Sequence, residues 1–196
     1  MAKTEFQKMM DEELYDVNDE KLVADRFAAR DLYEELNTIP FREKDRMTAL
    51  VTKLFGSVGK NVEIRPRFAC DYGYNIHVGD NFFANFDCIL LDTCEINIGN
   101  NVLMAPKAQI YTAGHPYNLK ARTSWLGYGK PVTIGNNCWI GGDAVIVPGV
   151  AIGNNVIVGG GAVVPKSFGD NVVIAGNPAR IVKHLDAEGN VISEKK

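Results

Sequence analysis

Three histidines are the side chains of this chain best suited to exchange a proton near neutral pH: His77, His115 and His184. His115 lies in the irregular segment YTAGHPYNLKARTSWLGYGKP, residues 111–131. Long loops of compact folds commonly carry function, and an imidazole titrates at a pH of about 6.5, so His115 is a candidate general base. The alternative is a solvent-exposed histidine at the tip of a loop. His77 and His184 have no such setting and are predicted to be structural.

No metal centre is predicted. A zinc site needs several histidines or cysteines that meet at one ion. The histidines are far apart in the sequence and the cysteines form no Cys-x-x-Cys pair. We therefore predict that all four cysteines are small core residues: Cys70, Cys88, Cys94 and Cys138.

A repeat of six residues flanks the segment that carries His115. The tetrapeptide IGNN occurs at residues 98–101, 134–137 and 152–155, with the variants VGDN at 78–81 and FGDN at 168–171. Aliphatic residues recur at a spacing of six in one unbroken stretch: Ile134, Ile140, Ile146, Ile152, Val158 and Val164. Residues that are mostly small or apolar follow four positions after each of them, from Cys138 to Phe168.

This period fits neither an amphipathic helix nor a plain hairpin. It fits a chain that makes three flat faces per coil, one hexad each, with the first residue of every hexad inside a narrow prism. The glycine and asparagine that follow it turn the corner, because they adopt positive φ at low cost. Strands of successive coils then pair in parallel about 4.8 Å apart, and the core forms by stacking of coils. We predict an all-β fold, a parallel β-helix.

The first part of the chain differs from the rest. All 19 glycines lie at Gly56 or later, and the earlier residues are dense in charges of both signs. Apolar residues fall at helical spacing in two stretches: Leu22, Ala29, Tyr33 and Leu36, and then Met47, Leu50, Val51 and Leu54. We expect helices near residues 4–13, 19–37 and 42–55, with Asn18 or Asp19 as the cap of the second. These helices either cover one end of the main domain or also wall a substrate pocket.

Three parts are therefore predicted. Residues 1–57 form a helical subdomain, residues 58–185 form the β-helix with an excursion loop at 112–131, and residues 186–196 form a C-terminal tail. Of the 196 residues 46% are hydrophobic and 23% charged, and the formal net charge is −3. This composition excludes a wholly disordered chain and argues against nucleic-acid binding by bulk charge.

We also expect no membrane segment and a cytoplasmic location. No apolar run approaches the roughly 18 residues that span a bilayer. The N-terminus, MAKTEFQKMMDEE, has no apolar core of a secretory signal.

Five segments resemble the maltose and galactoside O-acetyltransferases, a family of the hexapeptide-repeat acyltransferases. They are ELYDVNDEKLVADR (13–26), CDYGYNIHVGDNFFANFDCILLD (70–92), APKAQIYTAGHP (105–116), GKPVTIGNNCWIGG (129–142) and AGNPARIV (175–182). The resemblance covers nearly the whole chain and implies that the β-helix is left-handed. It implies an enzyme that moves an acetyl group from acetyl-CoA to a sugar hydroxyl, with no metal.

The resemblance also implies the catalytic roles. The loop histidine of the family is the general base, which here is His115. Asn85, in the Ala-Asn-Phe motif, matches a polar residue that faces the reaction centre and bonds the acceptor or the developing oxyanion. For Asn85 the alternative is a turn asparagine.

The acceptor is expected to bind Asp71, Asn85 and Asp92, with Arg26 contributing from the helical subdomain. The galactoside enzymes have an aspartate where this chain has Val17 and a serine where it has Asp71. These differences favour the maltose or glucose branch of the family.

Acetyl-CoA is expected to lie along a groove beside the coils. The residues that the resemblance and the local chemistry suggest for it are Trp139, Gly141, Gly142, Gly159, Gly160, Lys166, Arg180 and Lys183. Glycines let a pantetheine arm approach the backbone, and cations pair with phosphates. The alternatives are glycines that only turn corners and cations that lie on the free surface. Pro165 and Lys166 stand where the family usually has Thr-Lys.

The family resemblance further implies a homotrimer with each active site between neighbouring prisms. Three alternatives stay open. The acceptor could be a xenobiotic, an amino-sugar or serine instead of a maltose-, glucose- or galactoside-type sugar. The chain could be a non-catalytic β-helix scaffold, which the presence of His115 disfavours. A metalloenzyme on the same fold, such as a carbonic anhydrase, would need a histidine cluster that the sequence lacks.

Overall fold

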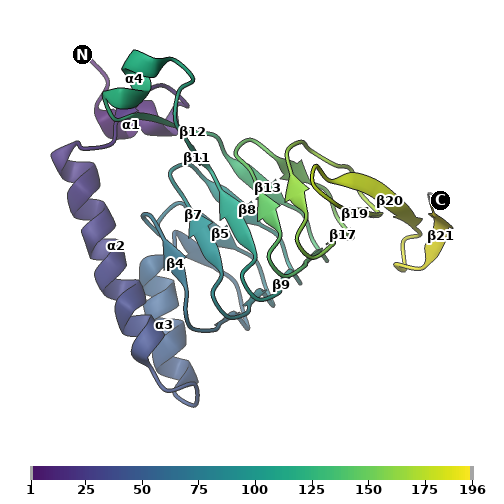
Figure 1. The fold of residues 1–196 in the computed structure, drawn as a ribbon. Helices are drawn as coiled ribbons and strands as arrows, with labels where there is room; N and C mark the ends of the chain where they lie inside the picture. The colour runs from purple at the N-terminus through teal and green to yellow at the C-terminus, as the bar shows by residue number, and fades with distance from the viewer. Residues whose placement is uncertain (1, 195–196) are drawn as a thin grey trace.

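The computed structural model describes residues 2–194 and shows a β-helix of triangular section with helices packed at its N-terminal end (Figure 1). The helices are α1 (Glu5–Met10), α2 (Glu20–Thr38) and α3 (Lys44–Leu54). The three predicted helices are thus confirmed, but the first ends at Met10. It ends there because Glu12 has a φ of 59°, which a continuing right-handed helix does not allow.

The helices bury the faces that their apolar spacing predicts. Leu22, Ala29 and Leu36 of α2 are buried, and Asp19 caps this helix by accepting from the Leu22 backbone N–H at 3.1 Å. Met47, Val51 and Leu54 of α3 pack into the main core. The helical part thereby closes the open N-terminal end of the β-helix.

Parallel strands build the three faces of the prism, and we name the faces in chain order. The first face contains β2 (Ser57–Val58), β5 (Ile76–Val78), β8 (Ile96–Ile98), β13 (Val132–Ile134) and β16 (Ala151–Ile152). The second contains β3 (Glu63–Ile64), β6 (Phe83–Ala84), β9 (Leu103–Met104), β14 (Trp139–Ile140), β17 (Val156–Val158) and β19 (Val172–Ala175). The third contains β4 (Ala69–Cys70), β7 (Ile89–Leu91), β10 (Gln109–Tyr111), β15 (Val145–Ile146) and β18 (Val163–Val164).

The core confirms the hexad interpretation. All residues that begin a hexad between Ile134 and Val164 are at most 2% exposed, and the residues four positions later are buried as well. The four cysteines are buried and unpaired, as predicted. The predicted left-handed parallel β-helix is therefore the fold of this chain.

Ladders of asparagines stabilise the corner between the first and second faces. The last residue of each corner tetrapeptide has a φ between 54° and 59°: Asn81, Asn101, Asn137, Asn155 and Asn171. Asn101 accepts from Asn81 at 2.8 Å and donates to Asn137 at 2.9 Å, so side chains bond from coil to coil. Asparagine suits this position because it tolerates left-handed φ and carries both a donor and an acceptor.

An excursion loop leaves the third face after β10. It contains β11 (Ala113–Gly114), α4 (Leu119–Thr123) and β12 (Leu126–Gly129). Strand β12 pairs with β11 and, on its other edge, antiparallel with β1 (Tyr15–Asp16) of the N-terminal part. The loop is therefore held against the segment between α1 and α2, as Figure 1 shows.

The C-terminal end continues the second face. Strand β20 (Arg180–Leu185) pairs antiparallel with β19, and β21 (Val191–Glu194) pairs with β20. The predicted tail at residues 186–196 thus contains a strand, and its residues 195–196, like residue 1, lie outside the described residues. The predicted boundary between the helical subdomain and the β-helix falls between residues 57 and 58. Strand β2 spans this boundary and pairs with β5. The division of the chain into separate parts stays a prediction.

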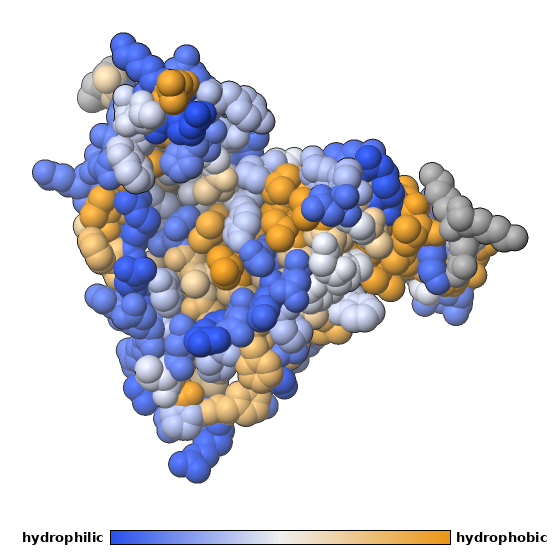
Figure 2. Space-filling model, in the orientation of Figure 1, coloured by the Kyte–Doolittle hydropathy of each residue, from blue (hydrophilic) through white to orange (hydrophobic). Residues whose placement is uncertain are grey.

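Hydrophobic residues reach the surface of the β-helix, whereas hydrophilic residues dominate the outer side of α2 (Figure 2). On the second face, Leu103 is 49% exposed and its partner across the strands, Trp139, is 51% exposed. Across residues 2–194, the helices are all too short or too polar to traverse a membrane.

Candidate active site

His115 lies at the base of the excursion loop, just after β11. Its Nδ1 atom is 2.9 Å from the backbone oxygen of Leu126, at the start of β12. A carbonyl oxygen only accepts hydrogen bonds, so the neutral imidazole carries its proton on Nδ1. The lone pair is then on Nε2, and the ring is exposed to solvent. The hairpin of the loop thus fixes both the tautomer and the orientation of a proton acceptor.

His115 borders a cavity of about 280 Å³ between the N-terminal segment, the third face and the loop. Arg26 and Asp71 also line it, so the structure brings together three of the predicted site residues. The other lining residues are Tyr15, Val17, Asn18, Tyr72, Thr93, Ala113, Gly114, Trp125 and Gly127. The size of this cavity and its several polar groups suit a small polar ligand.

Arg26 is fixed by two hydrogen bonds at the cavity. Its guanidinium donates to the Tyr72 hydroxyl at 2.8 Å and to the Val17 carbonyl at 2.7 Å. Asp71 accepts from the Thr93 hydroxyl at 3.3 Å. Burial raises the pKa of Asp71, and the positive charge of Arg26 opposes that rise. The cavity thus offers a carboxyl group beside a fixed cation, which is a suitable arrangement for binding hydroxyl groups.

Asp92 lies beneath the cavity rather than in it. Its side chain is 0% exposed, and its two oxygens accept backbone N–H bonds from Asp71, Tyr72 and Asn75 at 2.8–3.2 Å. Burial raises the pKa of Asp92 to about 7. The expectation that Asp92 binds the acceptor therefore needs correction, because in this structure its carboxylate is covered. It positions the backbone that carries Asp71 and Tyr72.

Asn85 lies at a different corner of the prism. It follows β6 at the edge between the second and third faces, and its side-chain oxygen accepts from the Phe86 N–H at 2.9 Å. His115, by contrast, extends from the edge between the third and first faces. The structure therefore does not bring Asn85 to the cavity of His115 within one chain.

The predicted glycines continue the corner of Asn85 toward the C-terminus. The Asn85, Gly141 and Gly159 N–H groups each donate to the next coil, to Met104, Val158 and Ile174. At Gly141 a Cβ atom would lie 2.6 Å from backbone atoms of that coil, so coil packing alone requires this glycine. Gly142 and Gly160 are the next corner residues, and a Cβ there would lie 3.2 Å and 3.3 Å from the nearest atom.

The predicted groups for the CoA nucleotide lie at the C-terminal end. Lys166 is exposed, with its ammonium group 5.6 Å from the centre of the Phe168 ring. Arg180 is exposed and donates to the carbonyl of Ala179 at 2.9 Å. Lys183 lies in β20, opposite Glu194. Trp139 is half exposed on the second face, one coil from Leu103.

The candidate site thus consists of two halves at two corners. One half is the cavity of His115, and the other is the column that begins at Asn85 and continues along the glycines. The sequence did not predict Tyr15, Tyr72 and Thr93 as cavity residues. For Tyr15, the pairing of two-residue strand β1 with β12 has no periodic signal. Tyr72 and Thr93 directly follow the predicted residues Asp71 and Asp92, and this adjacency is the signal that could have found them. Within residues 2–194, no cluster of three or more His, Cys, Asp or Glu side chains is arranged to hold a metal ion.

Comparison with known proteins defines the class to which this site belongs. A family model described as the maltose acetyltransferase hexapeptide capping motif matches residues 8–59, and the bacterial transferase hexapeptide model matches residues 131–166. The crystal structure of a maltose O-acetyltransferase from Clostridium difficile 630 is similar at 48% identity and a TM-score of 0.93, covering 95% of this chain and all of that one.

Two further proteins are similar over most of their length. A galactoside acetyltransferase in complex with coenzyme A is 35% identical with a TM-score of 0.91, over 95% of this chain and 94% of that one. Nodulation protein L of Rhizobium meliloti is 41% identical over 92% of this chain and 99% of its own. Fold and site define a hexapeptide-repeat acyltransferase. Within that class, the chain belongs to the maltose/galactoside O-acetyltransferase family, and it is an acetyltransferase of that type.

Proposed function

We propose that this enzyme transfers an acetyl group from acetyl-CoA to a hydroxyl of a maltose-, glucose- or galactoside-type sugar, with His115 as general base. The observation that carries the proposal is the hydrogen bond from His115 Nδ1 to the Leu126 carbonyl. It leaves Nε2 as the proton acceptor beside a polar cavity of about 280 Å³. Similarity to a galactoside acetyltransferase bound to coenzyme A supports the donor.

In the proposed reaction one proton moves first from the sugar hydroxyl to His115 and then from His115 to the CoA sulfur. His115 Nε2 takes the proton from the sugar hydroxyl as its oxygen attacks the thioester carbonyl carbon. The amide of Asn85 stabilises the oxyanion of the tetrahedral intermediate. The intermediate collapses, the carbon–sulfur bond breaks, and the imidazolium returns the proton to the CoA sulfur. No covalent intermediate with the protein forms.

The acceptor lies in the His115 cavity with Asp71 and Arg26. The donor lies along the corner column, where Trp139, Gly142 and Gly160 flank the pantetheine arm. Gly141 and Gly159 shape the same column. Lys166, Arg180 and Lys183 are the cations nearest to where the nucleotide phosphates would lie.

A homotrimer joins the two halves of the site. Because His115 and Asn85 lie at different corners of one prism, they meet only when the cavity of one subunit faces the Asn85 corner of the next. The exposed Leu103 and Trp139 on the second face would be covered in such an assembly. Threefold rings are a normal closed symmetry. We place this trimer in the cytoplasm.

The proposal is tested by measuring the free CoA thiol released from acetyl-CoA with maltose, glucose, a galactoside and a xenobiotic alcohol. We expect sugar-dependent release that falls by roughly 10²-fold or more in His115→Ala. Calorimetry with acetyl-CoA runs in parallel. No release together with no binding would contradict an acetyl-CoA enzyme, and release only with the xenobiotic would contradict the sugar acceptor.

A further inference from the structure

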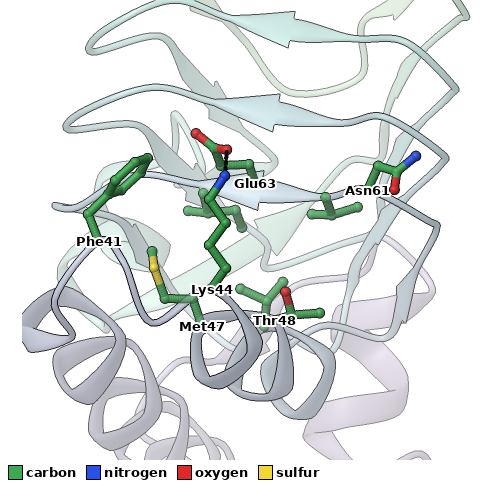
Figure 3. Close-up of a pocket in the computed structure, with 9 residues that line it drawn as sticks. Phe41, Lys44, Met47, Thr48, Asn61 and Glu63 are labelled. Carbon is green, nitrogen blue, oxygen red and sulfur yellow. Dashed lines mark ion pairs between the residues drawn. The ribbon is translucent and has the colours of Figure 1, made fainter.

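A second cavity, of about 300 Å³, lies between α3 and the first coil of the β-helix. Figure 3 shows Phe41, Lys44 and Met47 on the side of α3, with Asn61 and Glu63 from the coil opposite them. This cavity shares no lining residue with the cavity of His115. Neither the fold nor the proposed catalytic steps account for it.

The cavity combines an apolar floor, an aromatic side and a charged rim. Met47 and Val51 are buried in its floor, and the Phe41 ring is 46% exposed at its side. On the rim, the Glu63 carboxylate lies 3.6 Å from the Lys44 ammonium. Flat aromatic rings that meet the apolar face of a pyranose, together with fixed ionic groups for its hydroxyls, are the chemistry that recognises carbohydrate.

Arg65 links this cavity to the corner of Asn85. Its guanidinium is 3.2 Å from Glu63 and lies over three rings, 5.4 Å from the centre of Phe41, 4.9 Å from Phe83 and 5.3 Å from Phe86. Phe83 and Phe86 stand on either side of the Ala84–Asn85 pair. One planar cation therefore contacts both the side of the cavity and the motif at the reaction centre.

The strand register places the cavity on one side of Asn85 and the donor column on the other. Glu63 pairs with Phe83 and Ile64 pairs with Ala84, so the coil that lines the cavity lies one strand spacing, about 4.8 Å, before the coil that carries Asn85. Gly141 and Gly159 follow Asn85 along the same corner in the opposite direction. A ligand in the cavity would thus approach Asn85 from the side that the donor leaves open.

We propose that this cavity binds the distal sugar unit of an oligosaccharide acceptor while the reacting unit lies at Asn85. Phe41 is the stacking platform, Glu63 bonds the hydroxyls, and Arg65 positions the rings. The inference rests on the proposed function, because it extends the acceptor site of that reaction.

The test compares kcat/KM for maltose with kcat/KM for glucose in the wild type, Phe41→Ala and Phe41→Tyr. We expect kcat/KM of the wild type to be higher for maltose than for glucose. In Phe41→Ala the ratio of the two values should be about tenfold lower. Phe41→Tyr keeps the ring and should keep the ratio. Phe41 is half exposed, and thermal unfolding of each variant checks that the fold is intact. An unchanged ratio in Phe41→Ala, or a wild type with no preference for maltose, would overturn the subsite.

Binding of maltose, measured by saturation-transfer NMR, separates this inference from the proposed function. A wild type that acetylates no sugar contradicts the proposed function. If such a protein binds maltose and Phe41→Ala does not, the cavity is still a sugar site. If Phe41→Ala binds maltose as the wild type does, or if neither binds it, the subsite is wrong.

Discussion

The hydrogen bond between His115 and the Leu126 carbonyl determines which imidazole nitrogen, Nε2, can accept a proton. We predict that His115→Asn loses roughly 10²-fold or more in the rate of acetyl transfer, as much as His115→Ala. Asparagine can still donate to the Leu126 carbonyl but cannot take a proton at the position of Nε2. The measurement is thiol release under saturating acetyl-CoA. If His115→Asn retained activity within a factor of about three of the wild type, the imidazole would be a positioning group and not the base.

The buried carboxyl group of Asp92 makes stability depend on pH. Its pKa is raised from 3.8 to about 7 in the folded protein, so the folded state binds this proton more tightly than the unfolded state does. The free energy of unfolding should therefore fall as the pH rises from about 4 to about 7. In Asp92→Asn this part of the fall should be absent. Urea unfolding between pH 5 and 7.5 measures how the free energy of unfolding changes with pH in the wild type and in Asp92→Asn. The same pH dependence in both proteins would contradict a raised pKa of Asp92.

For single residues, the sequence could predict which side chains lie near the site, but not which of them are buried beneath the cavity. Asp71 and Asp92 both stand at the end of a third-face strand, and their sequence contexts look alike. Asp71 reaches the cavity, whereas the carboxylate of Asp92 turns back to the amides of the preceding coil. The difference depends on backbone geometry between coils, for which the sequence has no periodic signal.

At the scale of elements, the hexad pattern predicted the coils because each coil repeats the same burial rule. The pairing of β1 with β12 was not predictable. Two residues are too few to show alternation, and the partner strand lies far along the chain. Yet this pairing is what holds the His115 loop against the N-terminal segment.

The asparagine ladder has its own testable consequence. Asn101→Ala keeps a Cβ atom at a left-handed φ of 57° but has no side-chain amide to stabilise that conformation. It also removes the side-chain hydrogen bonds with Asn81 and Asn137. We expect a loss of about 2 kcal/mol in the free energy of unfolding, from backbone strain and lost hydrogen bonds. Asn101→Gly removes only the bonds and should lose less. Chemical denaturation compares the two, and an Asn101→Gly variant as unstable as Asn101→Ala would show that strain contributes nothing.

In the whole molecule, the two halves of the candidate site lie far apart on one subunit. One prism presents His115, Arg26 and Asp71 at one corner and Asn85 with the glycine column at another. The corner assignment follows directly from the hexads, but the closure of the cavity by the N-terminal segment required the structure. A single chain therefore carries all the predicted groups without assembling them.

Complementation between inactive subunits tests whether neighbouring subunits share the active site. His115→Ala and Asn85→Ala chains, each with a different affinity tag, are expressed together, and trimers that carry both tags are isolated. Each homotrimer should lose roughly 10²-fold in sugar-dependent thiol release. In a mixed threefold ring one of the three interfaces joins an intact His115 to an intact Asn85, so about a third of the wild-type rate should return. Mixed trimers that are no more active than the two parent homotrimers would contradict an active site shared between neighbouring subunits.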